Sequence, residues 1–227
     1  TTVSHELRTP LSLIVAPLKS IPRKELSEES CKYLDLAIKN AGKMETLIGE
    51  LVTFNQIETN NFPFYIQRGN PLAFIENLIA PYCHIAEEKK KTLTSDCEDN
   101  GEDVWFSPSY VERIISNLLS NAMKFTPQGG KIAVKARIIN KGNETNRYLQ
   151  IVVADTGIGI AKEEQANIFN KYYQTKRGYN MNSSGWGVGL ALVKRMAEIH
   201  KGTVSVESEP GHGATFTVEL NVESRNF

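Results

Sequence analysis

Cysteine and net charge are both scarce in this sequence. Its 227 residues contain three cysteines, at positions 31, 83 and 97, and no two of them form a C-x-x-C pair. A disulfide framework or a zinc site is therefore not expected, and a reducing compartment fits best. Lysine plus arginine and aspartate plus glutamate each total 26, so the formal net charge is zero. A surface that binds nucleic acid needs excess positive charge, so we expect no direct nucleic-acid contact.

Long apolar runs and several familiar motifs are missing too. No run approaches the ~20 residues of a membrane-spanning helix, and no signal peptide is visible. The G-x-x-x-x-G-K-[ST] of P-loop proteins is absent, as are the H-R-D and D-F-G of Ser/Thr/Tyr kinases. The glycines after residue 184 miss the dinucleotide fingerprint. His84, His200 and His212 lack metal-like spacing, and we interpret them as structural or solvated.

Hydrophobic residues make up 41% of the chain and recur every three or four positions in residues 1–57. This spacing predicts two helices, joined near Pro17 and Pro22, with Ser27 as the N-cap of the second. The apolar residues of the second helix recur with nearly a heptad repeat. Two helices that each carry an apolar stripe cannot bury both stripes by themselves. We expect the hairpin to pair with a second copy in a four-helix bundle. The alternative is a hairpin packed on the rest of the chain.

Beyond a polar linker at 58–63, the pattern changes to interleaved strands and helices, and residues 223–227 form a tail. This alternation over 64–222 predicts a second, α/β domain. The expected strands cover 64–68, 92–97, 104–106, 131–139, 148–154, 203–208 and 214–220, and the expected helices 71–91, 107–125, 162–169 and 187–200.

Three polar residues fall in one stripe of the helix expected at 107–125. Asn117, Asn121 and Lys124 are spaced i, i+4 and i+7 beside an apolar face. Amide oxygens suit Mg²⁺, and an ammonium suits phosphate oxygens. An ordinary solvated face is the alternative, although two asparagines in register in a helix indicate a function.

Two glycine-containing stretches follow. Asp155 ends an apolar strand and precedes Gly157 and Gly159. A carboxylate at this place can accept a hydrogen bond from an adenine amino group, and the glycines let the backbone approach the base. The alternative is a plain strand-to-helix turn, which would also need glycines for its dihedral angles. Gly185, Gly187 and Gly189 open the helix expected at 187–200. Glycine-rich backbone at the start of a helix offers N–H groups to phosphate. The polar, aperiodic residues 174–184 between the stretches predict a mobile lid.

His5 lies near the start of the first helix. Neutral imidazole is a competent nucleophile, and the adjacent Glu6 can accept the proton that attack on a phosphoryl group releases. Thr9 lies one turn further on the same face, and Pro10 should bend the helix there. A lone histidine on a helix is usually a solvated side chain, so this assignment depends on the whole stretch from Ser4 to Leu11.

The stretches 4–11, 117–127, 155–159, 168–173 and 185–189 resemble, in this order, the phosphoacceptor, N, G1, F and G2 boxes of sensor histidine kinases. The resemblance implies ATP and Mg²⁺ as cofactors, with Asn121 as the main metal ligand and Asn117 assisting. Lys171 stands where the family usually has arginine and is a candidate phosphate contact or a plain surface lysine. Trp186 departs from the smaller residue usual there.

The resemblance implies an α+β chain: a helical hairpin followed by an α/β sandwich of the gyrase/Hsp90/histidine-kinase type, with helices on one face of a mixed sheet. It also implies autophosphorylation of His5 and transfer to an aspartate of a response-regulator receiver domain, in two-component signalling. Thr9 matches the position linked to receiver dephosphorylation. The stretch around His5 and nearby Pro17 resemble hybrid members of the family.

Three further expectations follow. His5 comes so early that we expect a fragment, the cytoplasmic portion of a membrane-anchored bacterial sensor, with membrane contact only through segments upstream. The alternative function is a nucleotide-binding scaffold that acts mainly as a receiver phosphatase. A gyrase/Hsp90-type ATP hydrolase lacks support, because Arg113 and Asn117 stand where such enzymes place a glutamate before the metal-binding asparagine.

Overall fold

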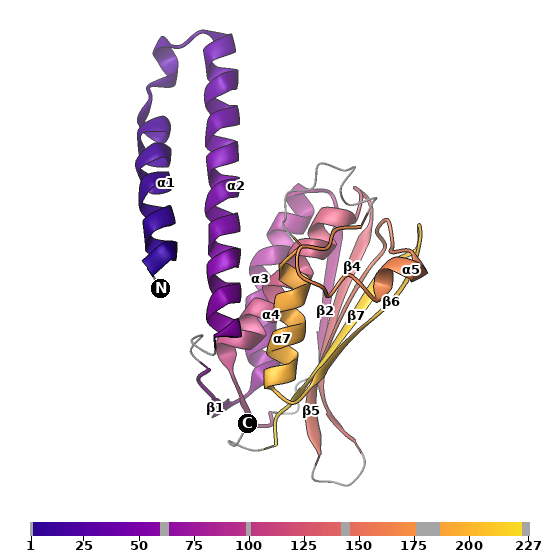
Figure 1. Cartoon of the computed structure of the whole chain (residues 1–227). Coiled ribbons are helices and arrows are strands. Elements are labelled where there is room, and N and C mark those ends of the chain that lie inside the picture. Colours follow the sequence, from indigo (N-terminus) through magenta and orange to yellow (C-terminus); the bar gives the residue numbers. More distant parts are fainter. Residues whose placement is uncertain (1, 60–63, 99–100, 142–145, 176–186, 224–227) are drawn as a thin grey trace.

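The computed structural model describes residues 2–59, 64–98, 101–141, 146–175 and 187–223. The chain starts with a helical hairpin: α1 (Thr2–Ser20), a 3-10 turn (Arg23–Glu25) and α2 (Glu28–Glu58) (Figure 1). Helix α1 passes through Pro10 and Pro17 and ends at Ser20, between the two prolines near which the sequence predicted the connection. None of the helices within these ranges is long and apolar enough to cross a membrane.

The start of α2 follows the sequence prediction. Ser27 is its N-cap, because its hydroxyl oxygen accepts a hydrogen bond from the Ser30 amide at 3.2 Å. Glu28 and Glu29 lie in the first turn, where negative charge is favourable.

The apolar residues of the hairpin divide between two surfaces. Leu11, Val15 and Ala41 are buried together in the seam between the helices, with Ile48 packed against them. A second set of large apolar side chains stays exposed: Leu13, Ile14, Tyr33, Leu36 and Met44. The hairpin stands beside the second domain and meets it where α2 contacts α7 (Gly189–Ile199) (Figure 1). Among the described side chains of the hairpin, these five are therefore left uncovered by the rest of the chain.

The second domain contains a five-stranded mixed sheet in the order β2-β4-β5-β7-β6, in which β2 and β4 are parallel and the other neighbours are antiparallel. The α3, α4 and α7 helices lie on one face of this sheet (Figure 1). Strands β1 and β3 form a separate antiparallel sheet of two strands. The elements are β1 (Gln67–Gly69), α3 (Pro71–Glu88), β2 (Thr92–Cys97), β3 (Val104–Phe106), α4 (Pro108–Phe125), β4 (Lys131–Asn140), β5 (Arg147–Asp155), α5 (Lys162–Gln165), α7 (Gly189–Ile199), β6 (Thr203–Glu209) and β7 (Gly213–Asn221).

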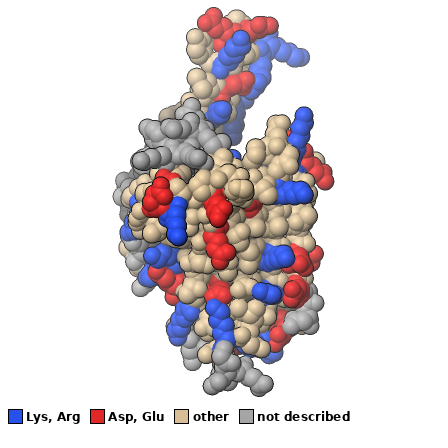
Figure 2. All heavy atoms as spheres, turned by 90° about the vertical axis from the view of Figure 1, so that its right-hand side faces the viewer, with Lys and Arg blue, Asp and Glu red and all other residues tan. Residues whose placement is uncertain are grey.

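The core lies between the helices and the sheet. Alternate residues of the strands point inward, such as Ile151 and Val153 of β5, and pack against the apolar faces of α4 and α7. The opposite face of the sheet is open. Figure 2 shows lysine, arginine, aspartate and glutamate scattered over that face, with no large area of one sign. The layered α/β sandwich expected from the sequence is confirmed.

Several boundaries differ from the prediction. Helix α3 ends at Glu88 rather than near residue 91, because Lys90 adopts a left-handed conformation (φ 54°). The first strand is Gln67–Gly69 rather than 64–68, since the Phe64 ring packs on Tyr110 and His200, with ring centroids 5.0 and 5.1 Å away. The helix expected at 162–169 is the single turn α5, and α7 begins at Gly189.

Candidate nucleotide site and phosphoacceptor helix

The sheet register brings the predicted nucleotide residues to one end of the sheet. Asp155, the last residue of β5, pairs with Ile132 near the start of β4 and with Ala214 near the start of β7. The C-terminal end of α4 meets the same place, because the Ile158 amide donates to the Phe125 carbonyl at 3.3 Å. Segments whose contacting residues are 23, 33 and 59 positions apart in sequence therefore meet at this end.

Helix α4 presents the predicted polar stripe. Asn117, Asn121 and Lys124 are half-buried beside its fully packed apolar face. The Asn117 side-chain amide donates to the Arg113 carbonyl at 2.8 Å. Its Oδ1 lies against the start of α7, because a Cβ added at Gly189 would stand 2.7 Å from that atom. The amide oxygen of Asn117 and the glycine-containing start of α7 thus face one another.

Asp155 has a mixed electrostatic environment. Burial raises the pKa of its carboxyl, and hydrogen bonds from the Gly157 and Ala214 backbone oppose that rise. The Gly157 amide donates to Oδ1 at 2.7 Å, which fixes the carboxylate at the mouth of the loop. A carboxylate accepts several hydrogen bonds, so this contact leaves capacity for the amino group of a base.

The loop after Asp155 is tied to the β6–β7 hairpin. The Gly211 amide donates to the Ile158 carbonyl at 2.8 Å, and the Ile160 amide donates to the Ser208 hydroxyl at 2.8 Å. Gly159 has φ +67°, and a Cβ there would lie 1.9 Å from the Glu209 carbonyl oxygen. Only glycine fits, since both the dihedral and the space exclude a side chain.

The stretch resembling the F box packs against the core through some of its aromatic side chains. The Phe169 ring meets Phe216 edge-on, with centroids 6.5 Å apart, and Tyr173 packs against the core. Tyr172 is exposed, but its amide donates to the Gly187 carbonyl at 3.0 Å. Residues on both sides of the expected lid are thereby held together. The Lys171 side chain is exposed at this junction.

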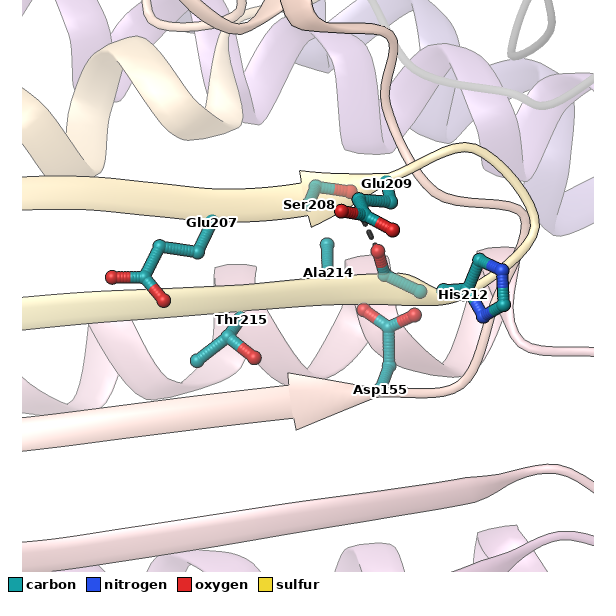
Figure 3. Close-up of a pocket in the computed structure, with 8 residues that line it drawn as sticks. Asp155, Glu207, Ser208, Glu209, His212, Ala214 and Thr215 are labelled. Carbon is teal, nitrogen blue, oxygen red and sulfur yellow. Dashed lines mark hydrogen bonds between the residues drawn. The ribbon is translucent and has the colours of Figure 1, made fainter.

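A shallow pocket of about 210 Å³ lies where Asp155 meets the β6–β7 hairpin (Figure 3). It is lined by Asp155, Glu207, Ser208, Glu209, His212, Gly213, Ala214 and Thr215. Glu207 and Thr215 alternate with the core-packed Val206 and Phe216, so they belong to the open face of the sheet. No residue of α4 lines this pocket, and we distinguish it from the region where α4, the Asp155 loop and α7 converge.

Some predicted residues lie outside the described part of the chain. These are Gly185 and Trp186, together with residues 176–184 of the expected lid. The backbone of α1 places His5, Glu6 and Thr9 on one helix, but their side chains are also outside the description. Helix α2 lies between α1 and the sheet domain (Figure 1).

Sequence reasoning missed the residues that hold the Asp155 loop. The Gln165 side-chain amide donates to the carbonyls of Ile160 and Ser208, at 3.1 and 2.7 Å. The Ser208 hydroxyl donates to the Gly213 carbonyl at 2.6 Å (Figure 3). No spacing in the sequence signals that Gln165 contacts Ser208, since the two residues are 43 positions apart.

Comparison with known proteins identifies both domains. The His Kinase A (phospho-acceptor) domain family matches residues 1–60. The family of histidine kinase-, DNA gyrase B- and HSP90-like ATPases matches residues 107–224. Histidine kinase P4 of Formosa agariphila is 32% identical over 227 residues, covering 97% of this chain and 16% of that protein. Sensor histidine kinase RcsC of Escherichia coli K12 is 32% identical over 225 residues, covering 96% of this chain and 22% of that protein.

Solved structures agree on the fold. Full-length ShkA, crystallised with AMPPNP, superposes with a TM-score of 0.79 at 23% identity, over 98% of this chain and 45% of that chain. Histidine kinase AdeS of Acinetobacter baumannii gives 0.63 at 20% identity, over 97% and 98%. The chain spans about a fifth of the length of its curated relatives, between 16 and 22% of those named here. With a phosphoacceptor hairpin followed by this ATPase domain, the chain belongs to the sensor histidine kinase family.

Proposed function

We propose that this chain uses ATP to phosphorylate His5 and passes the phosphoryl group to an aspartate of a response-regulator receiver domain. The observation that carries the proposal is the meeting of Asn117 with Gly189, and of Phe125 with Ile158, at one end of the sheet. This arrangement joins a metal-suited helix face, a carboxylate loop and a helix start in one place. A phosphoacceptor helix precedes it in the same chain.

The described residues fit MgATP. Asp155 would accept from the adenine amino group, and Lys124 and Lys171 would meet phosphate oxygens. Asn121 would be the main Mg²⁺ ligand, with Asn117 assisting, because amide oxygens are hard ligands of the kind that ion prefers. The ion would neutralise charge that develops on the transferred phosphoryl group.

The reaction forms one bond and breaks one. A neutral imidazole nitrogen of His5 attacks the γ-phosphorus, and the bond to the bridging oxygen of the leaving ADP breaks. The imidazole is left with a surplus proton, which Glu6 accepts or stabilises. Thr9, on the same face of α1, takes part in receiver dephosphorylation. A second transfer to a receiver aspartate regenerates the histidine.

The position of α2 affects how His5 can reach the nucleotide site. It lies between α1 and the sheet domain, so transfer needs either a movement of the sheet domain or a histidine from a second chain (Figure 1). The exposed apolar residues of the hairpin favour a homodimer. We place this portion on the cytoplasmic side of a membrane-anchored bacterial sensor, where a receiver domain is accessible.

Labelled ATP tests the proposal directly. The wild-type chain should incorporate γ-phosphate in a bond that is stable in alkali and labile in acid, as expected of phosphohistidine. The His5→Gln variant should incorporate none while binding ATP as wild type does, because His5 is on the hairpin and the nucleotide residues are on the other domain. Equal labelling of the two proteins would refute His5 as the acceptor. ATP binding without labelling of the wild type would favour the scaffold and phosphatase alternative.

A further inference from the structure

Lys91 reaches from the turn after α3 to the end of the helix that carries the nucleotide residues. Its ammonium donates a hydrogen bond to the backbone carbonyl of Met123, in the last turn of α4. The two residues are 32 positions apart in sequence. Met123 stands between Asn121 and Lys124, so the contact falls at the turn from which both of these side chains project.

The hydrogen bond from Lys91 satisfies the Met123 carbonyl, which has no amide donor within α4. The last four carbonyls of an α-helix have no amide donor within the helix. In α4 the Ala122 carbonyl accepts from the Thr126 amide at 3.0 Å, and the Phe125 carbonyl accepts from the Ile158 amide at 3.3 Å. Lys91 supplies the donor for Met123, and its positive charge is favourable at a helix C-terminus.

The backbone around Lys91 is fixed in the position that this reach requires. Helix α3 ends in a left-handed turn, where the Lys90 amide donates to Glu87 and the Lys91 amide to Ala86, each at 2.8 Å. The turn after α4 is held against the same segment, because the Gly129 amide donates to the Lys90 carbonyl at 2.7 Å. Lys91 is half-buried, and burial lowers the pKa of its ammonium.

We propose that Lys91 is a positioning residue for the nucleotide site: its ammonium holds the last turn of α4 so that Asn121 and Lys124 meet the metal and the phosphates. The proposal rests on the function proposed above, since it assigns Lys91 an effect on that same site. Lys91 itself touches neither ligand. Because Phe125 of the same turn binds the Asp155 loop, loosening this turn affects both walls of the site.

Three variants separate this role from general stability. Lys91→Met removes the donor and the charge but keeps a chain of similar length, and Lys91→Arg keeps a cation. Lys89→Met is the matched control, since it removes the same charge two residues away, at an exposed position. Calorimetry with AMPPNP should be run with Mg²⁺ and with a chelator, beside initial rates of histidine phosphorylation and thermal melting.

We expect Lys91→Met to weaken binding with Mg²⁺ about tenfold, which corresponds to about 1.4 kcal/mol. The loss should be smaller with the chelator, because metal coordination demands the tighter geometry. Lys91→Arg should recover most of the affinity, and Lys89→Met should bind as wild type. Lys91→Ala provides a second removal of the ammonium if Lys91→Met does not fold.

Wild-type affinity in the Lys91→Met or Lys91→Ala variant would overturn the proposal, as would a lower melting temperature with unchanged affinity. Equal losses in Lys91→Met and Lys89→Met would also overturn it, because they would indicate a general charge effect. Measuring Asn121→Asp in the same assay distinguishes failure of the nucleotide-site assignment from failure of the positioning role of Lys91. If that variant binds normally, the assignment of the nucleotide site fails; if it loses binding while Lys91→Met does not, the positioning role alone fails.

Discussion

Asp155 shows how a residue of the site can work against the fold. Burial raises the pKa of its carboxyl, so the charged form is less stable in the folded chain than in the unfolded chain. The folded chain therefore gains stability as pH falls through the folded pKa. The carboxylate is held in spite of this, by the Gly157 amide at 2.7 Å. A buried carboxylate with a raised pKa is typical of a functional site, and this agrees with the role that we propose for Asp155.

Asp155→Asn and Asn121→Asp should both weaken ATP binding, by different routes. The first removes the charge and the correct acceptor for the adenine amino group, and we expect a loss of about tenfold or more. It should not lower the melting temperature, because it also removes the cost of burying a charge. The second alters the proposed metal ligand, so its defect alone should depend on Mg²⁺ in calorimetry. Normal affinity in both variants would show that the site is assigned wrongly.

His200 gives the chain a defined response to acid. Burial lowers the pKa of its imidazole to about 4, although a hydrogen bond to the Met196 carbonyl acts in the opposite direction. The unfolded chain takes up this proton near pH 6.5 and the folded chain only near pH 4. The contribution of His200 to stability is thus complete above about pH 6.5 and falls by up to about 3 kcal/mol as the pH drops towards 4.

Denaturant unfolding at a series of pH values tests this. We expect His200→Leu to flatten the pH dependence of the unfolding free energy between pH 6.5 and 4. His212→Asn, at an exposed turn, should keep the wild-type slope. Identical slopes in all three proteins would mean that His200 titrates normally in the folded state.

At the scale of elements, the loop after β5 has a conformation that the neighbouring hairpin imposes. Gly159 lies against the Glu209 carbonyl of β6, and the loop exchanges hydrogen bonds with the β6–β7 turn. The loop position, and hence that of Asp155, depends on this docking. A change that separates the two elements should therefore affect both stability and ligand binding.

Gly159→Ala and Gly211→Ala form a matched pair for this point. Both glycines have positive φ, +67° and +87°, so either alanine costs about 1–2 kcal/mol in backbone strain. A Cβ at Gly211 meets nothing within 4 Å, whereas one at Gly159 would clash with backbone. Thermal melting and ATP titration should show a clearly larger loss for Gly159→Ala in both measurements. Equal losses would contradict the docking.

At the scale of the whole molecule, the hairpin has more apolar surface than one chain can bury. Leu36 and Met44 are 54% and 53% exposed on α2, while Leu34 and Ala41 of the same helix are buried, Ala41 against Leu11 and Val15 of α1. The spacing of these residues gives α2 two apolar faces, one for α1 and one for a further partner. A second copy presents the same surface and is the partner we propose.

We expect a monomer–dimer equilibrium that depends on concentration. Burying one leucine contributes about 1.5–3 kcal/mol, and a two-fold dimer contains the residue twice, so Leu36→Glu should weaken association at least about a hundredfold. Lys24→Gln lowers the net charge by the same unit at an exposed position in the turn between the helices, and should leave association unchanged. Sedimentation equilibrium measures both. A wild-type chain that stays monomeric at high concentration would refute the bundle.

The sequence alone determined the order of the domains and most elements of the sheet. Strands Thr92–Cys97 and Val104–Phe106 agree with prediction to the residue, and α4 begins one residue later than predicted. Local patterns sufficed there, because alternation and helical spacing are written in neighbouring residues. The polar stripe Asn117, Asn121, Lys124 could be read in the same way, since its members share one helix.

Only the tertiary structure decided what depends on contacts between distant segments. The sequence could not show that Asn117 faces Gly189, that Ser208 holds the loop beside Asp155, or that Lys91 binds the Met123 carbonyl. Nor could it separate the hairpin's buried seam from its exposed stripe, because both are apolar at helical spacing. These features depend on contacts between residues that are about thirty or more positions apart in the sequence. The spacing of residues carries no information about such contacts, and in the second domain the register of the sheet sets which segments meet.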